Sequence, residues 1–170
     1  MGLDMYLEVR KYVSQYDYNN GDRIRTPEFD ALQDASGITD LSKFSEFGGM
    51  TVSYPVGYWR KANAIHGWFV RECGGGIDEC QDIDVPREKL VELREACDSV
   101  LRVPANVNWG LEDAASKAGL LPTRGFFFGS HEMDEWYMQD MKYTIEMLDH
   151  VLSIVPEDSW HWSFNYRASW

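Results

Sequence analysis

Both ends of the chain alternate apolar and polar side chains with a period of two. Residues 2–13 ("GLDMYLEVRKYV") and 160–170 ("WHWSFNYRASW") show this alternation, which is typical of β-strands with one buried face. A strand of this kind is stable only beside other strands, so the two ends are expected to share a sheet. The side chains expected on the buried faces are Leu3, Met5, Leu7 and Val9, and Trp160, Trp162, Phe164 and Tyr166.

Three other segments of the sequence have the spacing of apolar residues that is typical of helices. Apolar residues recur every three or four positions in Tyr58–Glu72, 86–101 and 131–155, with "GGG" at 74–76 ending the first segment. Residues 124–130 ("RGFFFGS") are expected to form a short apolar strand. The fold class predicted is α+β, with a small mixed or antiparallel sheet from the N- and C-terminal strands packed against three main helices.

The chain is expected to form a single domain over residues 1–170. Within it, residues 14–50 are polar and rich in turn formers, and "PEFDALQDA" is the one stretch there that favours a short helix. We interpret 14–50 as a variable insertion or lid, because connections without regular structure are rarely this long unless they serve a function.

Charge narrows the classes of partner. The 28 acidic and 16 basic residues give a net charge of −12, which disfavours binding to DNA, RNA or a membrane surface. No signal peptide or membrane-spanning run is recognisable, so a cytoplasmic location is expected. The cysteines, Cys73, Cys80 and Cys97, lack the close spacing of zinc ligands, so we expect free thiols, no metal site and no cofactor.

The segment "YWRKANAIHGWF" (58–69) is the most crowded in the sequence. On a helix, Tyr58 and Phe69 fall on the core face, while Arg60, Asn63 and Gly67 form a polar arc. Such an arc is typical of a ligand groove, although plain packing of a core helix is the alternative. The candidate ligand-binding residues here are Trp59, Arg60, Lys61, Asn63, His66 and Trp68.

A second candidate lies where 124–130 leads into the last helix. Ser130 is positioned to cap that helix, and the acidic residues Glu132, Asp134 and Glu135 in its first turn suit hydroxyls, an amine or a divalent cation better than a phosphate. Capping alone explains these carboxylates equally well. The candidate ligand-binding residues of this stretch are Arg124, Ser130, Asp134, Trp136 and Tyr137.

Catalytic motifs are scarce. His66, His131 and Glu132 are candidate acid–base residues, and "HWS" at 161–163 has the H-x-S form of some phosphodiesterases but lacks the second copy that this chemistry needs. Walker A, G-x-S-x-G and H-E-x-x-H motifs are absent. Binding without turnover is therefore favoured, with a hydrolase or lyase acting on a nucleotide or phosphoester as the alternative.

Four blocks resemble a family of small phage and prophage proteins. They are "MGLDMYL" at the start, "GYWRKANAIHGWF", "LLPTRGFFFGS…DEWY" and the final aromatic strand. Residues 14–50 lie outside the resemblance, and His131 stands where the family has a threonine. The family is essentially uncharacterised, so it implies a context and not a reaction.

In that context an accessory protein in the cytoplasm of an infected bacterial host could sequester a nucleotide-derived immune signal. Stacking on aromatic side chains suits a small nucleotide-like ligand. An acidic inhibitor that binds a host protein is the remaining alternative, and a homo-oligomer is possible for any of these functions.

Overall fold

A computed structural model describes residues 2–19, 22–38, 48–103, 108–157 and 160–170. Its main sheet is antiparallel, with strand order β4-β1-β6-β5. The N- and C-terminal strands are direct neighbours, as the sequence predicts, and the α+β class is confirmed. The strands of this sheet are β1 (Asp4–Ser14), β4 (Gly49–Arg60), β5 (Ile83–Val85) and β6 (Trp162–Ser169).

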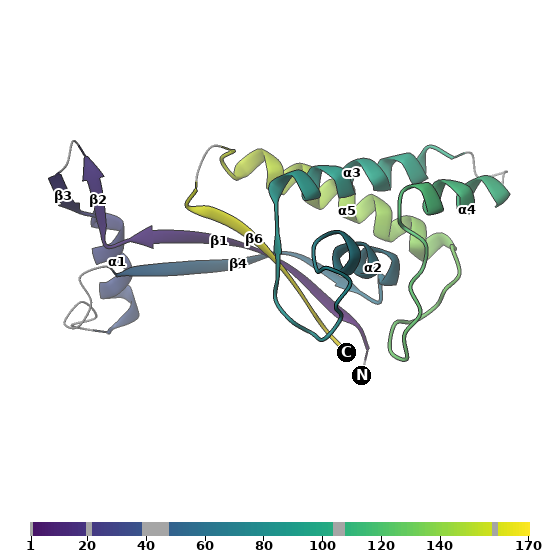
Figure 1. The fold of residues 1–170 in the computed structure, drawn as a ribbon, viewed down its shortest axis with the longest axis horizontal. Coiled ribbons are helices and arrows are strands. Elements are labelled where there is room, and N and C mark those ends of the chain that lie inside the picture. The colour runs from purple at the N-terminus through teal and green to yellow at the C-terminus, as the bar shows by residue number, and fades with distance from the viewer. Residues whose placement is uncertain (1, 20–21, 39–47, 104–107, 158–159) are drawn as a thin grey trace.

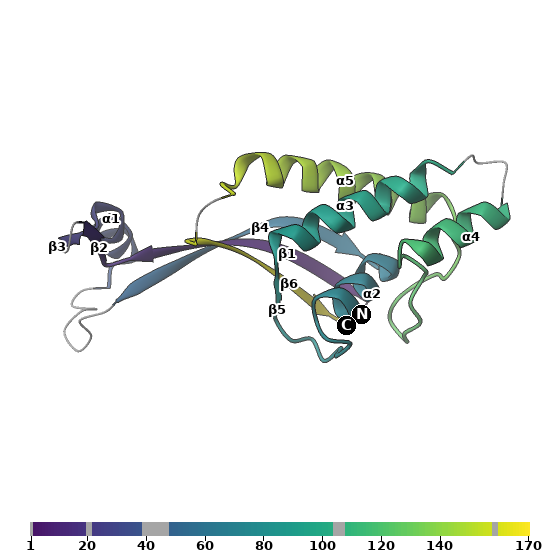
Figure 2. The same ribbon diagram turned by 45° about the horizontal axis from the view of Figure 1, so that its top comes forward.

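Helices cover one face of this sheet. Figures 1 and 2 show α3 and α5 side by side across that face, with α2 close to the chain ends. The core beneath them contains Met5, Leu7 and Val9 of β1 and Leu3 just before it, alternate residues as expected from the period of two. The helices are α1 (Pro27–Ser36), α2 (Asn63–Glu72), α3 (Arg87–Leu101), α4 (Asn108–Lys117) and α5 (Glu135–Ile154).

β1 and β4 extend well beyond the other strands and carry a small subdomain at their far end (Figure 1). β6 pairs with β1 only as far as Lys11, so from there on the sheet is two strands wide. We call the described part of residues 12–54 the arm. It contains the predicted short helix, α1, and a hairpin that the sequence did not predict, β2 (Tyr16–Asn19) with β3 (Asp22–Arg25).

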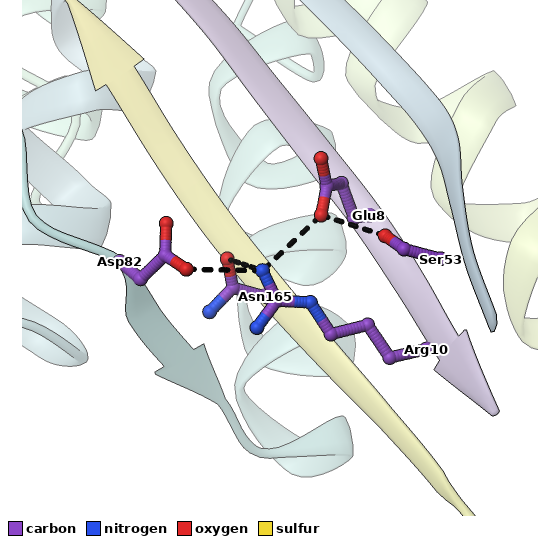
Figure 3. A network of polar contacts seen from close by, with 5 residues as sticks. All are labelled: Glu8, Arg10, Ser53, Asp82 and Asn165. Atoms are coloured by element: carbon purple, nitrogen blue, oxygen red, sulfur yellow. Dashed lines mark hydrogen bonds and ion pairs between the residues drawn. The ribbon is translucent and has the colours of Figure 1, made fainter. Parts of the chain in front are cut away.

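The face of the sheet away from the helices is polar, and one arginine links its strands (Figure 3). The Arg10 guanidinium donates to Glu8 (3.2 Å), Asp82 (3.0 Å) and the buried Asn165 (2.9 Å). The Ser53 hydroxyl donates to Glu8 (2.8 Å). Contacts from β1, β6 and the segment before β5 thus converge on Arg10, and β4 joins them through Glu8, which fixes the alignment of these elements.

β4 contains a bulge that changes which of its side chains face the helices. Gly57 lies opposite Leu7 but Pro55 lies opposite Glu8, so β4 has one extra residue, Val56. Because side chains alternate strictly along a strand, the extra residue moves Tyr54 onto the helix-facing side. The alternation of inward and outward side chains in 52–59 therefore shifts by one residue at Val56, which would not happen in a strand without a bulge.

Two expected elements are wrong. Tyr58–Arg60 is not helical, because these residues end β4 by pairing with Asp4–Tyr6, and α2 begins only at Asn63. Residues 124–130 form turns and no strand. At Gly125 a Cβ would lie 2.6 Å from the Phe128 ring, and Gly129 has a φ of +86°, so the segment curls tightly where the apolar run suggested an extended chain.

Candidate functional site

A pocket of about 280 Å³ lies where the N-terminal ends of α2 and α5 meet. It brings together the two segments that the sequence singled out, although they are some seventy positions apart in the chain. The pocket is lined by Arg60, Lys61, Ala62, Asn63, Ala64, Ile65, Pro122, Ser130, Glu132, Asp134, Trp136, Tyr137, Asp140 and Met141.

The N-terminus of α2 has no side-chain cap and no acidic residue in its first turn. Its first helical hydrogen bond runs from the His66 N–H to the Ala62 carbonyl (3.0 Å). The N–H groups of Ala64 and Ile65 precede this bond and have no acceptor within the helix. Both residues are buried and line the pocket, so the positive end of the helix dipole lies beside it.

Two cations stand at the same end of α2. Arg60 and Lys61 are exposed, and neither forms an ion pair with any residue that the structure describes. Lys61 has a φ of +61°, a left-handed conformation that is unusual for a residue with a side chain. Its side chain runs between Gly2 and Gly129, where added Cβ atoms would lie 3.2 and 3.1 Å from Lys61 carbons. The two glycines leave room for the lysine.

Asn63 holds the wall of the pocket that segment 122–130 forms. Its amide donates to the carbonyl oxygens of Phe128 (3.0 Å) and Ser130 (2.7 Å), and its side-chain oxygen accepts the Thr123 N–H (3.1 Å). Asn63 is 4% exposed. Because these bonds use both amide N–H groups and one lone pair of the oxygen, we infer that Asn63 positions segment 122–130.

The same segment covers the rest of the expected polar arc. At Gly67 a Cβ would overlap the Thr123 hydroxyl, and Arg71 donates to the Gly119 carbonyl. Asn63 and Gly67 are therefore buried against residues 119–130, whereas Arg60 stays exposed.

The N-terminus of α5 is capped from within the chain. The Asp134 carboxylate accepts the N–H groups of Trp136 (3.0 Å) and Tyr137 (3.1 Å). The sequence indicated Ser130 as the cap, but its hydroxyl accepts the Glu132 N–H instead (3.1 Å). α5 begins at Glu135, so Asp134 and not Ser130 occupies the N-cap position.

Asp140 is a lining residue that sequence reasoning missed. Burial, followed by repulsion from Asp134, raises the pKa of Asp140 to about 6. The signal that could have revealed it is helical spacing, since Asp140 follows Trp136 by four positions and Tyr137 by three. The pocket thus has cations and free N–H groups at the α2 end and carboxylates at the α5 end.

Among the expected binding aromatics, only Trp136 and Tyr137 line the pocket. Trp136 is 73% exposed, whereas Tyr137 is buried and donates its hydroxyl to the Leu120 carbonyl (2.9 Å). Trp59 and Trp68 are core residues at 2% and 3% exposure, and the Trp59 indole donates to Thr144 (2.9 Å).

His66 lies away from the pocket. Its ring contacts the Tyr166 hydroxyl through Nδ1 (2.7 Å) and Asp78 through Nε2 (3.0 Å), and it is 1% exposed. A carboxylate beside Nε2 favours the tautomer that donates from that nitrogen, which leaves Nδ1 to accept from Tyr166. His66 thereby joins α2 to β6 and to the loop that carries Asp78.

His131 and Arg124 are exposed and do not line the pocket, whereas Glu132 does. The structure therefore does not bring either candidate histidine into the pocket beside Glu132.

No group of three or more potential ligands that could hold a metal ion occurs in the described part of the chain. The cysteines are free, and burial raises the pKa of Cys73 to about 11 and that of Cys97 to about 12. Thiols with such pKa values are mostly protonated at neutral pH and are poor nucleophiles.

The chain matches no protein-family model, and no curated protein or solved structure shows significant similarity to it. Among the helices that the structure describes, none is long and apolar enough to cross a membrane.

Proposed function

We propose that the pocket between α2 and α5 binds a small nucleotide-like ligand and holds it without chemical turnover. The observation that carries this proposal is the α2 end of the pocket, where an uncapped helix N-terminus meets two cations, Arg60 and Lys61, that have no ion-pair partner in the described structure. A helix N-terminus together with cations that lack a partner among the described residues is a typical environment for a phosphate.

Arg60 and Lys61 are adjacent in the chain, and both differ from the majority of the described basic side chains, which form ion pairs. With a net charge of −12, most basic side chains have carboxylates nearby, as Arg94 does with Asp149 (2.8 Å) and Lys117 with Asp113 (2.6 Å). Two adjacent cations beside a pocket, without an ion pair to any described residue, therefore suit an anion supplied from outside.

The α5 end of the pocket suits the uncharged part of such a ligand. Trp136 exposes most of its ring, which favours stacking against a base. Glu132 and Asp140 can accept hydrogen bonds from ribose hydroxyls or an exocyclic amine, and they would repel a phosphate. Opposite ends of the pocket thus favour a single orientation of the ligand.

The size of the pocket limits the size of the ligand. A volume of about 280 Å³ is at the small end of ligand sites, which suits a mononucleotide and not a polymer.

The absence of turnover is proposed from the lining residues. None of those lining the pocket is a histidine, and the Ser130 hydroxyl contacts the Glu132 N–H in place of a base. Neither the hydrolase or lyase alternative nor the acidic protein-binding inhibitor has an observation of comparable weight behind it. The resemblance to phage proteins suggests that the ligand is an immune signal, held in the cytoplasm of an infected bacterial host.

Isothermal titration calorimetry with a panel of nucleotides tests the proposal. Arg60→Gln removes one charge-assisted hydrogen bond, so it should weaken binding by roughly tenfold or more. Arg124→Gln is the matched control, because it removes the same charge from an exposed residue that does not line the pocket.

Native mass spectrometry of the loaded protein tests the absence of turnover. The ligand should be recovered with unchanged mass after denaturation. Recovery of a cleaved nucleotide would refute sequestration, and failure of every nucleotide to bind would refute the ligand class.

A further inference from the structure

The outer edge of β4 is uncovered over only part of its length. β4 ends the main sheet on one side, and β1 is its one neighbour there. At the body end, the Tyr58 N–H donates to the Tyr143 hydroxyl of α5 (3.3 Å), so α5 covers that part of the edge. Pro55 has no N–H to offer a further strand. Among the residues that the structure describes, none covers the edge over Gly49–Tyr54, in the arm.

An apolar groove of about 790 Å³ adjoins this edge. Its floor includes Val9, Val13 and Val52, and its two walls come from α1 and from the C-terminal end of α5, with Ile154 on the α5 side. Val52 is 43% exposed, Tyr54 68% and Ile154 59%. The bulge in β4 places Tyr54 and Val52 opposite Val9 and Lys11, on the groove side of the sheet.

We propose that two copies of this chain pair along Gly49–Tyr54, antiparallel to each other, around a two-fold axis near Val52. The result would be one continuous sheet across both copies. Exposed strand edges commonly pair in this way unless charges or a covering element prevent it. The proposal concerns the arm and is independent of the nucleotide pocket, which lies at the other end of β4.

Charge favours a second copy as the occupant. Gly49–Tyr54 ("GMTVSY") has no charged side chain, in a chain with a net charge of −12. A two-fold axis pairs this strand with itself, so no like charges face each other, whereas most other surfaces of two such acidic chains would repel. Met50 of one copy would lie opposite Tyr54 of the other, which joins apolar side chains on the groove side.

The groove supplies the area that strand pairing lacks. A stable interface buries roughly 800 Å² from each partner, more than a few paired residues provide. Because the two copies run in opposite directions, the arm end of one would lie beside the body end of the other's groove. α1 of each copy would then lie along the open side of its partner's groove, and Ile154 would lose solvent contact.

Light scattering after size-exclusion chromatography, over a range of micromolar concentrations, tests the proposal on the whole chain. The wild type should be a dimer. Val52→Lys places two cations at the two-fold axis and should raise the dimer dissociation constant roughly tenfold or more. Val91→Lys is the matched control: Val91 is 41% exposed, lies on α3 away from β4, and its substitution should leave the dimer intact.

Far-UV circular dichroism shows whether each variant is folded. A monomeric wild type overturns the proposal, as does a wild-type dimer that Val52→Lys leaves unchanged. Nucleotide binding should persist in Val52→Lys, so a failure of either proposal leaves the other one testable.

Crosslinking supplies a second readout that does not depend on tolerance of a charge. Residues directly opposite in an antiparallel pair have Cα atoms about 4.5–5.5 Å apart, within the range for a disulfide. Val52→Cys in a Cys80→Ser background should therefore form a disulfide-linked dimer under mild oxidation, and Val91→Cys in the same background should not. Equal crosslinking of the two variants would count against pairing at this edge.

Discussion

The N-termini of α2 and α5 meet at one pocket but satisfy their backbone N–H groups differently. α5 has its own cap, Asp134, and a further acidic residue in its first turn, Glu135. α2 has neither, and it is preceded by Arg60 and Lys61. A carboxylate at a helix N-terminus already compensates the positive end of the helix dipole. A helix N-terminus flanked by cations instead favours the binding of an anion. The difference indicates which end of the pocket would receive a phosphate.

The largest expected effect comes from Asn63, which begins α2 and anchors segment 122–130. Asn63→Ala removes three hydrogen bonds and leaves the Phe128 and Ser130 carbonyls and the Thr123 N–H without this partner. We expect a loss of about 3 kcal/mol in the free energy of unfolding, measured by urea denaturation.

Asn63→Asp is the informative companion variant. It keeps the acceptor for Thr123 but replaces the donor with a carboxylate beside two carbonyl oxygens, so it should be at least as destabilising as Asn63→Ala. Wild-type stability in either variant would show that Asn63 is not the anchor and that its amide is free for a ligand.

Gly67 tests how closely segment 122–130 packs on α2. Alanine is the better helix former, but its Cβ would overlap the Thr123 hydroxyl and lie 3.0 Å from the Thr123 Cβ. Crowding of this kind outweighs the gain in helix propensity, so Gly67→Ala should cost about 2 kcal/mol of stability in thermal or urea unfolding.

The double variant Gly67→Ala with Thr123→Gly removes the obstructing side chain and keeps the Thr123 backbone N–H. It should recover most of the loss. If Gly67→Ala alone were stabilising, residues 119–130 would not be packed against α2 at Gly67.

The sequence predicted the fold better than the course of the chain between its elements. Period-two alternation identified β1 and β6, because each has one buried face. It could not locate β4, whose bulge at Val56 shifts the alternation by one residue, nor the boundary between β4 and α2. Tyr58–Arg60 has spacing compatible with either a strand or a helix, and only the pairing with β1 distinguishes them.

For the pocket, too, the sequence indicated the segments involved but not the contacts that their residues make. Sequence reasoning selected the two segments that form the pocket, since unusual polar residues gathered in both. It could not show which of those residues face the pocket. His66 is held by Tyr166, 100 positions away, and Trp59 by Thr144, 85 positions away, and no local pattern reveals such contacts.

Asp134 is the corresponding test on the α5 side. Asp134→Ala removes the acceptor for the N–H groups of Trp136 and Tyr137, and loss of an N-cap costs about 1 kcal/mol. Asp134→Asn keeps a capping oxygen without the charge and should remain close to wild type in thermal unfolding. A Ser130→Ala variant as unstable as Asp134→Ala would mean that α5 is capped by Ser130, against the hydrogen bonds described above.

The smallest effect is expected from Asp140 and depends on pH. Burial raises the pKa of Asp140 to about 6, above its value of about 3.9 in an unfolded chain. The folded state therefore favours the protonated carboxyl, and the stability that this group contributes is present below about pH 4 and lost as the pH rises through about 6. Asp140→Asn should stabilise the protein at neutral pH and have little effect near pH 4. Because the carboxyl keeps some contact with solvent, screening holds the gain to about 1 kcal/mol or less. Urea unfolding of the wild type and variant across this range measures the difference. A gain in stability that is independent of pH would contradict the raised pKa of Asp140.

The charge of Asp140 also affects the ligand. An anion at the α2 end should bind more tightly to Asp140→Asn than to the wild type at neutral pH, since the Asp140 carboxylate repels it from across the pocket.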